Sequence, residues 1–183
     1  MIKVIASDMD GTILNRKHRL SERNALAIKK AEEKGIQFMF ATGRDYSGVA
    51  GIMEERRIRC ACILLNGAEI RDEDGNVIQA FEMKKEKIKE AIAVLDRYGV
   101  VVNFMTGEGI AVLRTEEEVK RDILERLEVM APDEKPADRE KVAEFFVKYQ
   151  YRYYPSHLEK LLTEEASIKK LEAFCKDSAL VEK

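Results

Sequence analysis

The sequence predicts an α/β protein with a parallel sheet, followed by a smaller α+β region. Hydrophobic segments at residues 2–6, 36–41 and 60–65 have the length and composition of buried strands, and amphipathic helical patterns separate them. A strand, a helix and a further strand form the crossover unit of a parallel sheet. This alternation stops after residue 66, so we expect one unit over residues 1–82 and a second over 83–183.

The first predicted strand runs directly into Asp8-Met9-Asp10-Gly11-Thr12. Ligands of open α/β sheets bind outside the carboxyl ends of the strands, so we expect both aspartates at such a site. Residues two apart in an extended chain lie on the same side, and both carboxylates can then address one cation or phosphoryl group. Their repulsion favours a bound Mg²⁺. Asp-x-Asp-Gly alone is also typical of a solvated turn, but the preceding strand favours the site.

The second predicted strand ends in Thr42-Gly43-Arg44. The Thr42 hydroxyl and the Gly43 amide precede a helix expected over residues 45–57, and such donors suit phosphate oxygens. Arg44 can bind a phosphate through two hydrogen bonds or be a surface charge, and the sequence leaves both interpretations open. The third strand ends in Asn66-Gly67. Three neighbouring strands therefore end in Asp, Thr and Asn, a concentration that favours a binding site.

The helices between these strands have recognisable starts and buried stripes. Ser21 is a candidate N-cap after a polar loop at 13–20. The apolar residues expected to face the sheet are Ala25, Leu26, Ile28 and Ala31 in the first helix and Val49, Ile52 and Met53 in the second. Cys60 and Cys62 alternate in the third strand and are expected in the core. Their spacing does not fit a Cys-x-x-Cys redox or zinc pair.

A hairpin signal at Asp74-Gly75 ends the first unit, and the second region then mixes helices with short strands. The predicted elements are hairpin strands at 68–72 and 76–81, a helix from Lys84 to Gly99, strands at 100–105 and 109–114, a helix opened by the capping box Thr115-x-x-Glu118, a loop at 132–138, a helix from Arg139, and an interrupted helix from Ser156-x-x-Glu159 to Lys176. The tyrosines at 149, 151, 153 and 154 are candidates either for substrate contacts or for packing along an edge strand.

The composition excludes several function classes. The chain has 32 basic and 34 acidic residues and a net charge of −2, so no global field attracts nucleic acid or an anionic membrane. No apolar run reaches membrane length, and no basic leader precedes an apolar signal core, so we expect a cytoplasmic protein. His18 and His157 are isolated in the sequence, and we assign them no chemistry.

The motifs together resemble those of the haloacid dehalogenase superfamily of phosphohydrolases. The first family motif, Asp-x-Asp-Gly-Thr, matches residues 8–12 residue for residue, and Thr42 matches the hydroxyl residue that ends the second strand. Asn66-Gly67-Ala68 resembles the type IIB, or Cof-like, branch. The resemblance implies a Rossmann-like core with an inserted α+β cap, here the second region.

The resemblance also implies a function. It implies Mg²⁺-dependent hydrolysis of a small phosphorylated metabolite through an aspartyl-phosphate, with Asp8 as nucleophile and Asp10 as general acid and base. It places Mg²⁺ on Asp8 and the Asp10 carbonyl. The implied phosphate and substrate contacts are Met9, Gly11, Thr42, Gly43, Arg44 and Asn66.

The chain departs from the family pattern in its second half. The third motif, a phosphate-binding Lys, and the fourth, an acidic loop that completes the Mg²⁺ site, are not recognisable after Leu113. We therefore expect an incomplete core whose first strand is left as an edge, with weak or no activity. We also expect either self-association through that strand or a longer protein whose remainder was lost. Two other classes remain open: a receiver-like signalling domain, and a non-catalytic relative that only binds phosphate or a partner.

Overall fold

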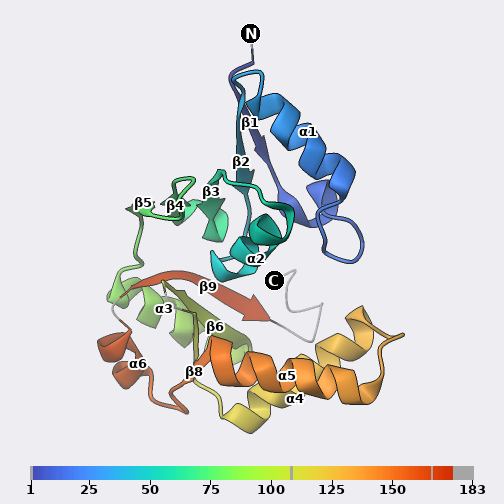
Figure 1. The fold of residues 1–183 in the computed structure, drawn as a ribbon. Helices are drawn as coiled ribbons and strands as arrows, with labels where there is room; N and C mark the ends of the chain where they lie inside the picture. Colours follow the sequence, from blue (N-terminus) through green and yellow to red (C-terminus); the bar gives the residue numbers. More distant parts are fainter. Residues whose placement is uncertain (1, 108, 166, 175–183) are drawn as a thin grey trace. The chain divides into compact units, whose positions relative to one another are not determined.

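The computed structural model describes residues 2–107, 109–165 and 167–174. These fall into two compact units, Met1–Glu82 and Met83–Lys183 (Figure 1). The first unit holds a five-stranded sheet and the second a four-stranded sheet, both with helices, which confirms the α/β class. In the described part of the chain no helix is long and apolar enough to cross a membrane.

The sheet of the first unit has the strand order β1-β2-β3-β4-β5. Its strands are β1 (Val4–Ser7), β2 (Gln37–Ala41), β3 (Ala61–Leu64), β4 (Glu69–Arg71) and β5 (Val77–Ala80). β1, β2 and β3 are parallel, as predicted, and the β4–β5 hairpin continues the sheet with antiparallel pairing. The predicted turn is also present, because the Asp72 carboxylate accepts hydrogen bonds from the backbone N–H groups of Asp74 and Asn76.

Helices α1 (Glu22–Glu32) and α2 (Ser47–Arg56) connect the parallel strands. The Ser21 hydroxyl caps α1 by accepting a hydrogen bond from the Asn24 amide at 3.1 Å, as the sequence predicts. The buried helix residues are Ala25, Ile28, Val49 and Met53. Leu26 was wrongly placed in the buried stripe: it is 57% exposed.

Strand β1 differs from its prediction as a buried strand. Val4 and Ile5 are 45% and 38% exposed. The reason lies in the topology, since β1 ends the sheet and pairs only with β2 among the described residues. One edge of an apolar strand is therefore left open.

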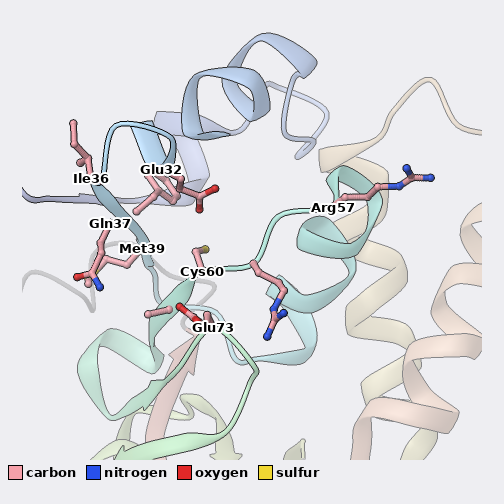
Figure 2. A pocket seen from close by; sticks show the side chains of 11 residues that line it. Glu32, Ile36, Gln37, Met39, Arg57, Cys60 and Glu73 are labelled. Carbon is pink, nitrogen blue, oxygen red and sulfur yellow. The ribbon is translucent and has the colours of Figure 1, made fainter. Parts of the chain in front are cut away.

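At the amino ends of β2 and β3 the first unit contains a cavity of about 540 Å³ (Figure 2). Its lining residues are Glu32, Gly35, Ile36, Gln37, Phe38, Met39, Arg57, Arg59, Cys60, Ala61 and Glu73. Cys60 and Cys62 are both buried, as predicted for core residues. Cys175 lies outside the described residues.

The sheet of the second unit has the order β8-β7-β6-β9. Its elements are α3 (Lys85–Leu95), β6 (Val101–Thr106), β7 (Ile110–Val112), α4 (Glu116–Met130), α5 (Pro136–Gln150), β8 (Tyr151–Tyr153), α6 (Leu158–Glu164) and β9 (Ile168–Phe174). The neighbours Ala111 and Val112 belong to different apolar clusters, one with Ile88 of α3 and Leu161 of α6, the other with Val119 of α4. Successive strand residues point to opposite faces, so both faces of this sheet are covered.

Three predictions in this unit are wrong. Residues 168–174 form strand β9 and not a helix, because they pair along the whole length of β6, and sheet pairing overrides local helical propensity. Ser156 cannot cap α6, because its φ of 59° is left-handed, and the helix begins two residues later. Helix α5 also begins at Pro136 instead of Arg139, since proline is well tolerated in a first helical turn.

The four tyrosines near β8 lie in different environments. Tyr151 and Tyr153 lie on this edge strand with their rings stacked at 6.4 Å. Tyr154 is buried, and its hydroxyl donates a hydrogen bond to Glu165 Oε1 at 2.8 Å. Tyr149 does not belong to the strand: it lies on α5 and is 64% exposed. The capping box at Thr115 is present as predicted.

Candidate active site

The carboxyl ends of β1, β2 and β3 lie at one edge of the first sheet, here called the carboxyl edge. The parallel register of the three strands brings Asp8, Thr42 and Asn66 to this edge. Backbone hydrogen bonds connect the segments that follow the strands: the Asn66 N–H donates to the Thr42 carbonyl at 3.1 Å, and the Leu65 N–H donates to the Arg44 carbonyl at 3.0 Å. The polar residues after β2 and β3 are therefore held by the main chain.

After β1 the chain turns through Met9–Ile13, where the backbone of Asp10 and Gly11 is not helical. Gly11 has a φ of 74°, a conformation that favours glycine. The Met9 side chain is fully buried, so a ligand at the carboxyl edge can contact this residue only through its backbone. The buried Met9 side chain anchors the turn between the two aspartates.

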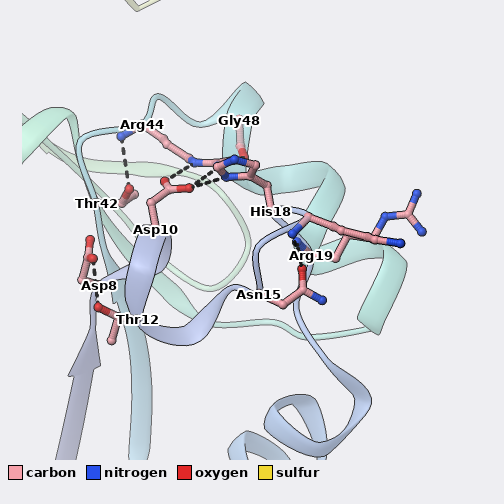
Figure 3. Close-up of polar contacts among 10 residues, drawn as sticks. Asp8, Asp10, Thr12, Asn15, His18, Arg19, Thr42, Arg44 and Gly48 are labelled. Carbon is pink, nitrogen blue, oxygen red and sulfur yellow. Dashed lines mark hydrogen bonds and ion pairs between the residues drawn. The ribbon is translucent and has the colours of Figure 1, made fainter. Parts of the chain in front are cut away.

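The Asp8 carboxylate is exposed at the end of β1. Its Oδ2 atom accepts a hydrogen bond from the Thr12 hydroxyl at 3.2 Å (Figure 3). Its Oδ1 atom accepts no hydrogen bond within the described residues. Asp8 therefore keeps one carboxylate oxygen available for a metal ion or for an electrophile.

Asp10 has a different environment. Arg44 donates two hydrogen bonds to it, from Nε to Oδ2 and from Nη2 to Oδ1, both at 2.7 Å, and His18 Nδ1 lies 2.9 Å from Oδ1 (Figure 3). The hydrogen bonds from Arg44, with a smaller contribution from His18, lower the pKa of Asp10 from 3.8 to about 2. Asp10 is therefore ionised at neutral pH in this arrangement.

The third polar contact of Arg44 is also made within the chain, since Nη1 donates to the Gly48 carbonyl at 3.1 Å. Each guanidinium nitrogen thus has a partner on Asp10 or Gly48. Arg44 is therefore paired within the chain in this structure, and its role as a phosphate contact stays a prediction.

His18 was not recognised from the sequence. It lies in the polar loop after the first motif, where no periodicity marks a functional residue. Asn15 shapes this loop, because its side-chain oxygen accepts hydrogen bonds from the backbone N–H groups of Lys17 and Arg19. His18 itself has a φ of 53°. The one signal in the sequence for the shape of this loop is Asn15, because asparagine side chains often form turns by bonding to nearby backbone N–H groups.

Thr42 is buried, with an exposed fraction of 6%. Its hydroxyl oxygen accepts a hydrogen bond from the Arg44 N–H at 3.2 Å, which leaves the hydroxyl hydrogen to donate. The helix predicted to start near Asp45 begins at Ser47, with Tyr46 as its N-cap residue, and the Asp45 carboxylate accepts a hydrogen bond from the Gly48 amide at 2.9 Å. Asn66 is exposed, with a φ of 60°.

The residues fit part of a Mg²⁺ site. Asp8 offers a carboxylate oxygen and Asp10 a backbone carbonyl, both hard oxygen donors of the kind that Mg²⁺ prefers. The Asp10 carboxylate is engaged by Arg44 and His18. In the described ranges no group of three or more His, Cys, Asp or Glu side chains is arranged to hold a metal ion.

Known proteins are similar to this chain in sequence and in fold. It is 33% identical over 109 residues to phosphatase YwpJ and 38% identical over 78 residues to 5-amino-6-(5-phospho-D-ribitylamino)uracil phosphatase YcsE, both from Bacillus subtilis. These matches cover 60% and 43% of the chain but only 38% and 31% of the two relatives. A haloacid dehalogenase-like hydrolase from B. subtilis superimposes with a TM-score of 0.76 at 26% identity, over 99% of this chain and 64% of that structure.

The family model for haloacid dehalogenase-like hydrolases matches residues 5–179, nearly the whole chain. This match includes the aspartate motif, the Thr42 segment and the second unit. Together with the arrangement of Asp8, Asp10 and Thr42 at the carboxyl edge, it confirms the predicted family: the chain belongs to the haloacid dehalogenase-like hydrolases.

Proposed function

We propose that this chain carries the nucleophile-bearing part of a Mg²⁺-dependent phosphatase site that hydrolyses small phosphomonoesters through an aspartyl-phosphate. The observation that supports this function is the exposed Asp8 carboxylate at the end of β1, with Oδ1 left without a hydrogen-bond donor among the described residues. An unengaged carboxylate oxygen beside phosphate-compatible donors can attack phosphorus in line.

In the first step, Asp8 Oδ1 forms a bond to phosphorus while the bond from phosphorus to the ester oxygen breaks. Asp10 gives a proton to the leaving oxygen. In the second step, Asp10 accepts a proton from water, the water oxygen attacks phosphorus, and the bond from phosphorus to Asp8 breaks to release inorganic phosphate. The Thr42 hydroxyl and the Gly43 amide are proposed to bind the phosphoryl oxygens. Mg²⁺, held by the Asp8 carboxylate and the Asp10 carbonyl, would neutralise phosphate charge.

The contacts of Asp10 with Arg44 and His18 add a requirement to these two reaction steps. Bound to Arg44 and His18, Asp10 is ionised, which is the state needed to accept a proton from water. To act first as an acid it must gain a proton. We therefore propose that substrate binding loosens the contact between Arg44 and Asp10 before the ester bond breaks.

The proposed substrate is a small phosphorylated metabolite, because one of the relatives is a phosphatase for a phosphorylated ribitylaminouracil. We propose that Met1–Glu82 forms the amino-terminal part of the catalytic core and that Met83–Lys183 is the type IIB cap. The buried free thiols of Cys60 and Cys62 suit the reducing cytoplasm, which we propose as the location.

The function is tested by measuring phosphate release from p-nitrophenyl phosphate with Mg²⁺, for the wild-type chain and for Asp8→Asn. If the chain is a phosphatase, Asp8→Asn should abolish phosphate release. A phosphoryl group trapped on the wild-type chain should then be found on Asp8. A chain that binds phosphate but shows no turnover and no trapped phosphoryl group would instead be a non-catalytic binding protein. The match to the hydrolase family favours the phosphatase over a receiver-like domain.

A further inference from the structure

Three sulfur atoms meet in the core of the first unit, on residues separate from those at the carboxyl edge. Met53 Sδ of α2 lies 3.8 Å from Cys60 Sγ and 3.9 Å from Cys62 Sγ, and the Cys62 thiol donates a hydrogen bond to the Cys60 carbonyl at 3.6 Å. The exposed fractions of Met53, Cys60 and Cys62 are 7%, 3% and 0%. We call these three residues the sulfur cluster.

The spacing of the sulfur cluster matches the size of a bound metal ion. Two sulfur ligands that each lie about 2.3 Å from one ion, with about 115° between the two bonds, are about 3.9 Å apart. The separations of Met53 Sδ from the two thiols, 3.8 and 3.9 Å, agree with this value. The three ligands come from rigid elements, α2 and the start of β3. Little movement is therefore needed to bind an ion.

The cluster is also reachable. Cys60 lines the cavity of about 540 Å³ at the amino ends of β2 and β3, as Figure 2 shows. Arg57 and Arg59 line the same cavity. Metal binding would convert two neutral thiols to thiolates and release two protons, so a monovalent ion would leave a net charge of −1. Arg59 is paired with Asp74, and Arg71, opposite Cys62 in β4, is paired with Glu69. Arg57 is therefore the lining residue that can offset this charge.

The donors are soft: two thiols and one thioether. Sulfur ligands of this kind select Cu(I), whereas hard ions prefer oxygen and structural Zn²⁺ takes four ligands.

We propose that Met53, Cys60 and Cys62 form a binding site for one Cu(I) ion, or for a similarly soft monovalent ion, separate from the proposed phosphatase site. The ion would be coordinated by two thiolates and one thioether in a plane. This site does not depend on the phosphatase function, because it shares none of the residues proposed to act at the carboxyl edge.

The test uses the 183-residue chain with Cys175→Ser, so that the third cysteine of the sequence cannot supply a thiolate. Cu(I) is titrated anaerobically against a chromogenic Cu(I) chelator, and the loaded protein is studied by X-ray absorption at the copper edge. We expect one Cu(I) per chain and three sulfur neighbours at about 2.2–2.3 Å.

Matched variants separate coordination from packing. Cys62→Ser should weaken Cu(I) binding by more than about 100-fold. This exceeds the effect expected when a residue that only contacts a metal ligand is changed. Met53→Leu conserves volume, should leave the fold intact, and should reduce the sulfur neighbours to two. Met39→Leu, on a cavity residue outside the cluster, should change nothing. Absence of stoichiometric Cu(I) binding, or unchanged affinity and sulfur count in folded Met53→Leu, would overturn the proposal even if Cys62→Ser fails to fold.

Discussion

Arg44 holds Asp10 in a planar ion pair, with two nitrogens of its guanidinium on the two carboxylate oxygens at 2.7 Å each. Lysine cannot reproduce this geometry, because an ammonium group is a point charge without a planar pair of donors. The pair joins residues 34 positions apart in the sequence, one after β1 and one after β2. It therefore couples the protonation of Asp10 to the position of the segment after β2.

The first prediction concerns this ion pair. In Arg44→Lys, the pKa of Asp10 should rise from about 2 toward 3.8, because the largest stabilising contact of the carboxylate is weakened. The measurement is a carboxyl NMR titration. Arg19→Lys, a neighbouring arginine whose side chain points away from Asp10 in Figure 3, is the control. An Asp10 pKa that is the same in Arg44→Lys and in wild type would show that the pair does not form in solution.

The same ion pair predicts the direction of an acid effect on stability. The pKa of Asp10 is lower in the folded chain than its ordinary value of 3.8. The contribution of ionised Asp10 to the free energy of unfolding is therefore fully present above about pH 4 and is lost as the pH falls toward 2. Denaturation curves of wild type and Asp10→Asn should differ most at neutral pH and converge near pH 2. A difference that grows in acid would contradict the pair.

The next prediction concerns His18. In His18→Ala, the pKa of Asp10 should rise, but less than in Arg44→Lys, because His18 contributes less than Arg44 to lowering it. If His18 also positions Asp10, kcat should fall while KM stays near its wild-type value. His157→Ala is the matched control, since His157 lies at the start of α6 in the other unit. Equal kinetics for both histidine variants would leave His18 without a role.

The sequence predicted the parallel strands, the hairpin and the aspartate motif, because each rests on a local pattern. It could not predict that Arg44 pairs with Asp10, because the distance between these two side chains depends on the register of β1 against β2. Their separation along the sequence does not indicate it. His18 was missed for the same reason: a loop residue is placed by its turn, which has no periodicity. The sequence predicts a helix over residues 168–174, because the pairing with β6 that makes them a strand involves residues far away in the sequence.

Mg²⁺ should bind this chain weakly. Asp8 supplies one carboxylate, the side chain of Asp10 is engaged by Arg44, and no cluster of three or more acidic, His or Cys ligands is present in the ranges that the structure covers. Calorimetric titration should give no tight stoichiometric binding, and Asp8→Asn should abolish the weak signal. Tight binding by wild type would mean that a further ligand had been overlooked.

The capping box of α4 offers a test of stability in the second unit. The Thr115 hydroxyl accepts a hydrogen bond from the Glu118 N–H, and the Glu118 carboxylate accepts one from the Thr115 N–H. Thr115→Ala should lower the free energy of unfolding by about 0.5–2 kcal/mol, as is usual for N-cap residues. Thr163→Ala is the control, because that hydroxyl bonds only to a carbonyl of its own helix, at Glu159. Urea denaturation followed by circular dichroism compares the two.

The last prediction concerns the open edge of β1. Val4 and Ile5 are exposed on a strand that pairs on one side only within the described residues, and such an edge is a template for pairing with another chain. We therefore expect this chain to self-associate in sedimentation experiments as its concentration rises. Val4→Lys should shift it toward the monomer, because a charged side chain on an edge strand opposes pairing with a second sheet.

The other edge of the same sheet supplies the control. Ile78 of β5 is 64% exposed, but β5 is a short strand of a hairpin. Ile78→Lys should leave self-association unchanged if β1 is the interface. A shift caused by Ile78→Lys and not by Val4→Lys would move the interface to β5, and a wild-type chain that stays monomeric at all concentrations would show that the open edge of β1 is protected in solution.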